Sequence, residues 1–144
     1  MNDKVFFDTN ILVYANDSSD RKKQDRARSL IEKSLTVQSA VISVQVLSEF
    51  WVTSTQKIEK PLPHHTAEKE IEFFELMDIV ELDLPIFREA LKFQKLYKFS
   101  FWDSLILSAA YSKGCSIIYS ENFQHEQKIM DMQIVNPFIL KADK

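Results

Sequence analysis

Glycine, cysteine and long apolar runs are scarce in this chain of 144 residues, and each scarcity excludes a class of protein. The single glycine, Gly114, cannot build a Walker A loop or a G-x-G-x-x-G turn, which excludes nucleotide cofactors held in those ways. The single cysteine, Cys115, excludes an internal disulfide and fits a reducing compartment. No apolar run approaches the roughly 20 residues of a membrane span, and the start of the chain has no signal-peptide pattern. We therefore expect a cytoplasmic protein without membrane association.

An excess of positive charge is also missing. The net charge is −3 and the pI is about 5.6, which is not the signature of a simple electrostatic nucleic-acid binder. A nucleic-acid substrate would therefore need a local basic surface or metal ions. The clearest basic cluster lies on one face of a helix predicted over residues 21–35, for which a solvated helix face is the simpler interpretation. Its members are Arg21, Lys22, Lys23, Arg26 and Arg28.

Short apolar segments alternate with helical patterns along the chain. Strands are predicted at residues 5–7, 40–43, 79–82 and 116–119, with a short edge strand at 134–135. Helices are predicted between them, over about 21–35, 44–55, 66–77, 85–97 and 101–111. This alternation is typical of βαβ units on a parallel sheet, so the sequence predicts an α/β fold in one domain of residues 1–144.

Acidic and amide side chains follow several of these strands. Asp8 comes directly after the first strand, Glu49 lies in the helix after the second, and Glu121 and Asn122 come after the fourth. Asp103 lies at the start of another helix. Because the carboxyl ends of the strands in such a sheet open on one edge, these groups can converge there.

Each of these carboxylates also has a purely structural interpretation. Asp8 can be the N-cap of a short helix, and Ser100 with Asp103 has the spacing of a capping box. Glu49 can be an ordinary exposed residue of a helix, although its half-apolar surroundings argue against this. The sequence leaves these alternatives open.

Carboxylates gathered without histidine or cysteine partners suit a hard cation such as Mg²⁺ or Mn²⁺. Without a cation they repel one another and raise each other's pKa. With divalent ions they form a site for the hydrolysis of a phosphate ester. The histidines His64, His65 and His125 are all predicted to be surface residues, so no histidine pair for metal-independent RNA cleavage is expected.

Four segments carry a resemblance to a known family. They are FDTNILVY at 7–14, SVQVLSEF at 43–50, FWDSLI at 101–106 and YSENFQ at 119–124. The sequence resembles the PIN-domain family of metal-dependent ribonucleases, and in particular the VapC-like toxins of bacterial type II toxin–antitoxin pairs. The resemblance implies a three-layer α/β/α sandwich with a central parallel sheet, a homodimer and an antitoxin partner.

The resemblance also implies an activity, the Mg²⁺- or Mn²⁺-dependent endonucleolytic cleavage of RNA by metal-activated water. Carried over by position, the acidic metal-site residues are Asp8, Glu49 and Asp103, and the supporting polar residues are Thr9, Asn10 and Ser120. One position departs from the family, which usually has an aspartate where this chain has Asn122. An amide oxygen still ligates a cation but supplies no charge, and the adjacent Glu121 is a second candidate for the fourth ligand.

Two other functions are compatible with the sequence. Asn122 is also the residue expected in a catalytically weakened PIN-like protein that acts mainly through partner binding. A metal-dependent phosphatase that forms an aspartyl phosphate would also place an aspartate after its first strand. Such enzymes typically have a second aspartate two residues later, where this chain has Asn10.

Overall fold

The computed structural model describes residues 3–139, so the ends of the predicted domain, residues 1–2 and 140–144, lie outside the described part. The strands are β1 (Val5–Phe7), β2 (Ala40–Ser43), β3 (Asp78–Val80), β4 (Ile117–Tyr119), β5 (Lys128–Ile129) and β6 (Met132–Val135). The helices are α1 (Thr9–Tyr14), α2 (Arg21–Thr36), α3 (Val44–Val52), α4 (His64–Phe74), α5 (Leu84–Tyr97) and α6 (Phe101–Ser112), and a π-helical turn, η1 (Thr53–Lys57), continues α3. Over residues 3–139 no helix has both the length and the apolar character that a membrane span requires.

The strands form one sheet of six in the order β3-β2-β1-β4-β6-β5. All neighbouring pairs are parallel except β5 with β6, so the predicted parallel sheet is confirmed with one antiparallel strand added at its edge. The prediction that residues 134–135 form the edge strand is wrong, because β5 pairs outside β6. With only two residues, β5 is too short to show an apolar pattern in the sequence.

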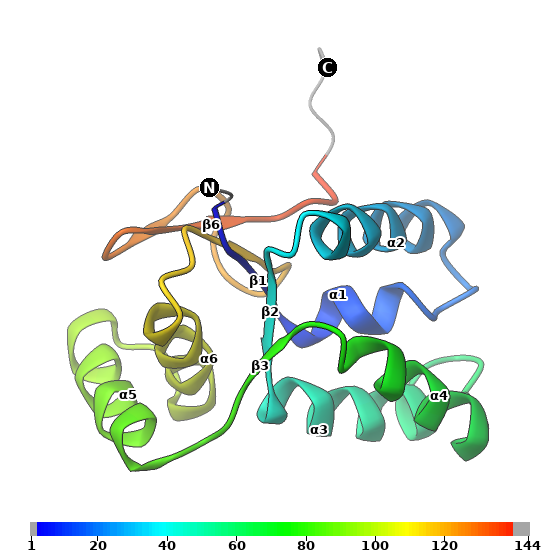
Figure 1. Cartoon of the computed structure of the whole chain (residues 1–144), viewed down its shortest axis with the longest axis horizontal. Helices are drawn as coiled ribbons and strands as arrows, with labels where there is room; N and C mark the ends of the chain where they lie inside the picture. Colours follow the sequence, from blue (N-terminus) through cyan, green and yellow to red (C-terminus); the bar gives the residue numbers. More distant parts are fainter. Residues whose placement is uncertain (1–2, 140–144) are drawn as a thin grey trace.

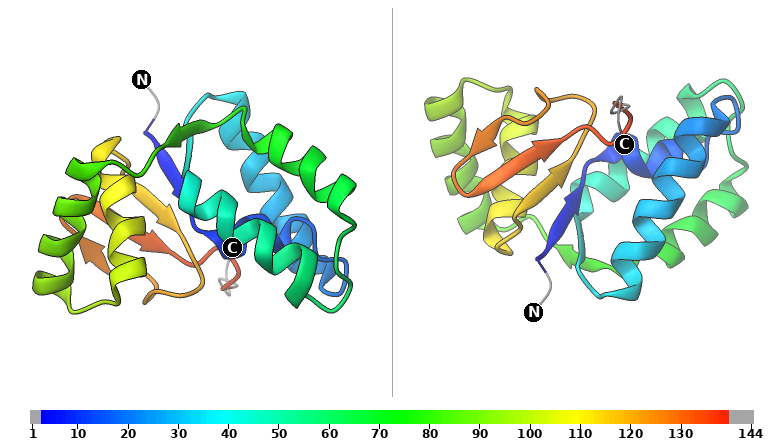
Figure 2. Two further views of the ribbon diagram at one scale, coloured as in Figure 1. Left: turned by 90° about the horizontal axis from the view of Figure 1, so that it is seen from below. Right: turned by 90° about the horizontal axis from the view of Figure 1, so that it is seen from above.

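Helices cover both faces of the sheet (Figures 1 and 2). The helices α1 to α4 lie on one side, and α5 and α6 lie on the other. Right-handed crossovers explain this division. The chain moves in one direction from β1 through β2 to β3, and it then reverses direction to reach β4. The predicted three-layer α/β/α sandwich is therefore confirmed.

The predicted helices are all present, with shifts at some ends. The pattern over residues 44–55 is broken into α3 and η1, and the helix predicted from 66 begins two residues earlier, after the extended N-cap residue Pro63. Side-chain caps fix other starts. Ser43 Oγ accepts from Val46 N at 3.2 Å, and Ser100 Oγ accepts from Asp103 N at 3.1 Å. These caps set where α3 begins after β2 and where α6 begins after α5.

The centre of the sheet is apolar and fully buried. Phe6 of β1, Ile42 of β2 and Ile118 of β4 are fully buried between the helix layers. Such continuous apolar strands are typical of a parallel sheet that is covered on both faces. The side chains that follow β1 and β4 are therefore held by strands that have little freedom to move.

The strand order reverses at β1, which has β2 on one side and β4 on the other. Phe7 pairs with Tyr119 across this boundary, and Asp8 N donates to Tyr119 O at 3.0 Å. In open α/β sheets the crevice at such a reversal is the usual place for a ligand. The residues that follow the paired strands, Asp8 and Ser120, lie at this crevice.

Candidate active site

Asp8 is the most buried carboxylate at the crevice. Its side chain is 4% exposed, and both oxygens accept hydrogen bonds. Oδ1 accepts from Thr9 N at 2.7 Å, and Oδ2 accepts from Ser120 Oγ at 2.7 Å. The interpretation of Asp8 as an N-cap is therefore confirmed, because its side chain caps the start of α1. The capping role does not by itself account for the burial or for the bond to Ser120.

The electrostatics of Asp8 link it to two other acids. The pKa of Asp8 is raised to about 6. Burial is the largest cause of this rise, the hydrogen bonds from Ser120 and Thr9 oppose it, and the negative charges of Glu49 and Asp103 add to it. Charges act in this way only over short distances in a protein, so the three carboxylates predicted from the sequence lie in one electrostatic neighbourhood.

Glu49 is held by groups from two helices. Thr9 Oγ1 donates to Glu49 Oε1 at 2.5 Å, and Gln45 Nε2 donates to Glu49 Oε2 at 3.0 Å. Its side chain is half-buried, so the interpretation as an ordinary exposed helical residue is wrong. Thr9 thereby connects the two acids, because its backbone N binds Asp8 and its hydroxyl binds Glu49.

Asp103 lies in the first turn of α6. Its backbone N donates to Ser100 Oγ, so the serine half of the predicted capping box is present. Partial burial raises the pKa of Asp103, and the negative charge of Glu49 raises it further. The negative charge of Glu49 therefore acts on both Asp8 and Asp103.

The supporting polar residues tie the two strand ends together. Glu121 N donates to Asn10 Oδ1 at 3.2 Å, and Asn122 N donates to Ser120 Oγ at 3.0 Å. The Ser120 side chain is fully buried, and its hydroxyl joins the loop after β4 to the Asp8 carboxylate. Asn10 Nδ2 is buried without a hydrogen-bond partner among the described residues.

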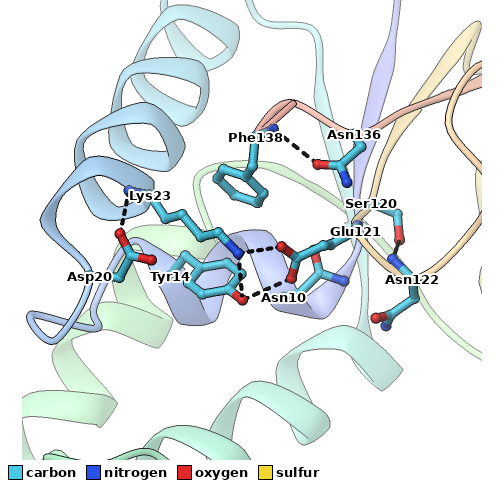
Figure 3. A network of polar contacts seen from close by, with 9 residues as sticks. All are labelled: Asn10, Tyr14, Asp20, Lys23, Ser120, Glu121, Asn122, Asn136 and Phe138. Atoms are coloured by element: carbon cyan, nitrogen blue, oxygen red, sulfur yellow. Dashed lines mark hydrogen bonds and ion pairs between the residues drawn. The ribbon is translucent and has the colours of Figure 1, made fainter. Parts of the chain in front are cut away.

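The Glu121 carboxylate is bound by other side chains (Figure 3). Tyr14 OH donates to Glu121 Oε1 at 2.8 Å, and Lys23 Nζ forms an ion pair with Glu121 Oε2. Lys23 Nζ also lies 4.5 Å from the centre of the Tyr14 ring and 5.3 Å from that of Phe138. Lys23 therefore neutralises Glu121, which is not among the charges that perturb Asp8.

Sequence reasoning missed this contact. Lys23 was expected on the solvated basic face of α2, and Glu121 follows it by 98 residues. No local pattern links residues so far apart. Arg21 and Lys22 are exposed as expected, whereas the Nε atoms of Arg26 and Arg28 donate to backbone carbonyls of other segments.

An open pocket of about 400 Å³ adjoins Glu49. It lies between α1, α3 and the loop after β4. The polar residues that line it are Thr9, Asn10, Tyr14, Asp17, Glu49, Thr53 and Asn122. Asn122 is therefore on the same side of its loop as the pocket, and Glu121 is not part of the lining. The pocket gives a ligand access to Glu49 from solvent.

The donor groups fit a hard divalent cation. Across residues 3–139, no three Asp, Glu, His or Cys side chains are arranged as a ready-made set of ligands for one ion. Mg²⁺ commonly binds through only one or two carboxylates and keeps several waters. Asp8 with Glu49 or Asp103 meets this need, and a cation would relieve the repulsion that raises the pKa of Asp8.

The histidines take no part in this arrangement. His64 and His65 are exposed, as predicted. His125 is more buried than expected, because its Nδ1 accepts a hydrogen bond from Asn136 N at 3.0 Å. This contact joins the loop before β5 to the residue that follows β6.

The fold is similar to those of bacterial toxins. A toxin–antitoxin complex from Klebsiella pneumoniae superposes with a TM-score of 0.72 at 20% identity, over 95% of this chain and all of the other. VapC20 of Mycobacterium tuberculosis, described as a toxin that cleaves the sarcin–ricin loop, superposes at 0.67 and 15% identity, over 83% of this chain and 90% of its own. VapBC2 of Rickettsia felis, bound to a DNA fragment from its promoter, superposes at 0.66 and 18% identity, over 90% and 96%.

At these identities the superpositions show a shared fold only. No protein of curated function matches the chain in sequence. The sequence model of the PIN domain, however, matches residues 5–128, which include the three acids, the supporting polar residues and all strands up to the start of β5. The chain belongs to the PIN domain family.

Proposed function

We propose that the protein is a Mg²⁺- or Mn²⁺-dependent endoribonuclease that acts in the cytoplasm as the toxin of a type II toxin–antitoxin pair. The observation that carries the proposal is the buried Asp8 carboxylate, whose pKa is raised to about 6 next to the negative charges of Glu49 and Asp103. Membership of the PIN domain family supports a nuclease, and the description of the similar VapC20 as an RNA-cleaving toxin supports RNA as the substrate.

Each side chain has a role in this proposal. Asp8, Glu49 and Asp103 bind the cation either directly or through its water shell, with Asn122 as a candidate fourth ligand at the pocket. Ser120 and the Thr9 amide orient the Asp8 carboxylate, and the Thr9 hydroxyl orients Glu49. When bound, the cation lowers the pKa of the attacking water and stabilises the charge that develops on the phosphate.

We also propose an antitoxin partner, a homodimer and a single domain over residues 1–144. The similar Klebsiella and Rickettsia structures are toxin–antitoxin assemblies, which supports the antitoxin. An antitoxin would have to shield or displace ligands from the pocket beside Glu49 to stop RNA cleavage.

A second candidate function is a PIN-like protein with little catalytic activity that works through partner binding. Two observations favour it, because Asn122 brings no charge to the pocket and Glu121 is already neutralised by Lys23. A phosphatase is less favoured, because residue 10 is an asparagine whose amide oxygen is occupied by Glu121 N.

RNA cleavage by the purified protein tests the proposal. We expect cleavage with Mg²⁺ or Mn²⁺ and none in EDTA, leaving 5′-phosphate and 3′-hydroxyl ends, because no histidine pair activates the RNA 2′-hydroxyl. The ends are identified by ligation and by mass spectrometry of the fragments. Products with 2′,3′-cyclic phosphate that persist in EDTA would contradict the proposal.

The set of metal ligands is tested by Mn²⁺-induced stabilisation, because a ligand that binds only the folded state raises its melting temperature. Asp103→Asn should weaken this response, and Asn122→Asp should strengthen it by adding charge. Glu121→Ala should lower the melting temperature without Mn²⁺ and leave the Mn²⁺ response unchanged, because its carboxylate is paired with Lys23.

Measuring melting curves over a range of Mn²⁺ concentrations separates the two effects. If Glu121→Ala removed the Mn²⁺ response and Asn122→Asp did not change it, Glu121 would be the fourth ligand. Cleavage need not be observed for this measurement, so it also examines the candidate without catalytic activity.

A further inference from the structure

Trp102 is unusually exposed for a tryptophan. It lies in the first turn of α6, directly before Asp103, and its side chain is 60% exposed. The other tryptophan, Trp51, is half-buried and packs on His64 at 4.9 Å between ring centres. Exposing so much aromatic surface is costly in water, so a contact that covers it would be favourable.

Hydrogen bonds hold the backbone of Trp102 beside the acidic site. Gln45 Nε2 donates to Trp102 O at 3.2 Å and also to Glu49 Oε2 at 3.0 Å. One amide group therefore connects the Glu49 carboxylate to Trp102. Trp102 is thus linked to Glu49 through Gln45, and it is joined directly to Asp103 in the chain.

One side of the indole of Trp102 packs against another aromatic ring. Phe101 packs edge-on against the indole, with ring centres 5.2 Å apart, and Phe101 in turn packs against Phe87 at 5.8 Å. Phe101 covers one side of the indole, while most of the surface of Trp102 faces solvent. The result is an exposed aromatic surface on a residue whose backbone is bonded to the same amide group as Glu49.

We propose that Trp102 is a stacking platform for an unpaired base of the RNA substrate, next to the phosphate that the acidic site cleaves. The proposal rests on the proposed function and adds to it the residue of this chain that contacts a base of the substrate. Bases that are free of pairing stack on exposed aromatic side chains, and the interaction tolerates any base because each has a π face. Trp102 is thus a binding residue that positions the phosphate.

A second copy of the chain fits this surface less well. A symmetric dimer centred on Trp102 would bring two sets of Glu49 and Asp103 together. Carboxylates that are brought together without a cation repel one another, so such a dimer would be unfavourable. An RNA strand brings with it the divalent cations that neutralise these carboxylates.

Tryptophan fluorescence tests the proposal directly. In Trp51→Phe, Trp102 is the only tryptophan, and the aromatic contact with His64 is retained. The probe is a single-stranded RNA oligonucleotide of mixed sequence, with Ca²⁺ in place of Mg²⁺ to suppress cleavage. We expect saturable quenching of Trp102 by this RNA and much less by the same RNA as a duplex.

Substitutions at residue 102 give the matched comparison. Trp102→Ala should weaken binding of the single strand by roughly 10-fold to 100-fold, the range measured for base–aromatic stacking, and raise KM with a smaller change in kcat. Trp102→Phe should recover most of the affinity because it restores a ring. Melting curves show whether each variant folds, which is expected because the side chain is largely outside the core.

The outcomes separate the two proposals. Equal RNA binding by wild type and Trp102→Ala, or no quenching of Trp102 by single-stranded RNA, would overturn the role of Trp102 while leaving RNA cleavage intact. Trp102 emission that changes only with protein concentration would indicate that a second copy of the chain covers Trp102. If Trp102→Ala also abolished dimerisation, the surface would be a dimer interface, and the role of Trp102 in RNA binding would be overturned. Wild-type protein that binds RNA through Trp102 but never cleaves it would instead overturn the proposed function.

Discussion

Asp8→Asn is expected to abolish RNA cleavage and at the same time to stabilise the fold. We expect kcat to fall by about 1,000-fold or more, because a metal site contributes several kcal/mol to the transition state and each 1.4 kcal/mol is a factor of ten. The amide has no charge to desolvate, so the cost that raises the pKa of Asp8 to about 6 disappears. A shift from 3.8 to about 6 corresponds to a stabilisation on the order of 3 kcal/mol at pH 7.5.

The sign of this stability effect depends on pH. The pKa of Asp8 is higher in the folded state, so its contribution favours folding below about pH 3.8 and is lost as pH rises through about 6. The melting temperature of Asp8→Asn should therefore exceed that of the wild type at pH 7.5, and the difference should shrink toward pH 4. Melting curves in EDTA at both values measure it. A variant that is both inactive and less stable at pH 7.5 would indicate a damaged fold rather than a lost ligand.

The cleavage rate is expected to fall steeply in mild acid. Protonated Asp8 cannot hold a cation, so at Mg²⁺ concentrations well below saturation the rate should drop about tenfold for each pH unit below about 6. Near-saturating Mg²⁺ should move the midpoint to lower pH, because cation and proton compete for the same oxygens. Initial rates at several pH values and two Mg²⁺ concentrations measure both effects.

Ser120→Ala is the matched variant for the pH profile. The Ser120 hydroxyl stabilises the charged form of Asp8 and lowers its pKa, so removing it should move the midpoint upward. A purely structural role for Ser120 would change stability but not the midpoint. A midpoint that stays near 6 in Ser120→Ala, or a rate that does not vary between pH 5 and 7, would show that Asp8 is not the titrating group.

The residues that could be predicted from the sequence are those with a local signature. Asp8 and Ser120 could be placed at the same edge because each follows a short apolar strand, and parallel strands end together. Asp103 could be placed at a helix start because Ser100 precedes it at capping distance. The α/β/α sandwich followed from the alternation of strands and helices.

The contacts that could not be predicted depend on how distant segments pack. In the sequence, Lys23 is one of several basic residues on one face of a helix. It contacts Glu121 only because α2 packs beside the loop after β4. Because that pairing engages the Glu121 carboxylate, we expect Asn122 rather than Glu121 to be the fourth ligand. The exposure of Trp102 could not be predicted from the sequence either, because a tryptophan in an apolar helix is usually part of the core.

The pairing of β1 with β4 has a consequence for folding. The two halves of the Asp8–Ser120 contact are 112 residues apart, and the segments between them form most of both helix layers. Contacts of such long range form late, since the intervening chain must first be ordered. A chain in which β4 has not yet joined the sheet therefore carries Asp8 without its side-chain donor Ser120. The proposed nuclease activity should accordingly appear only after β4 has paired with β1.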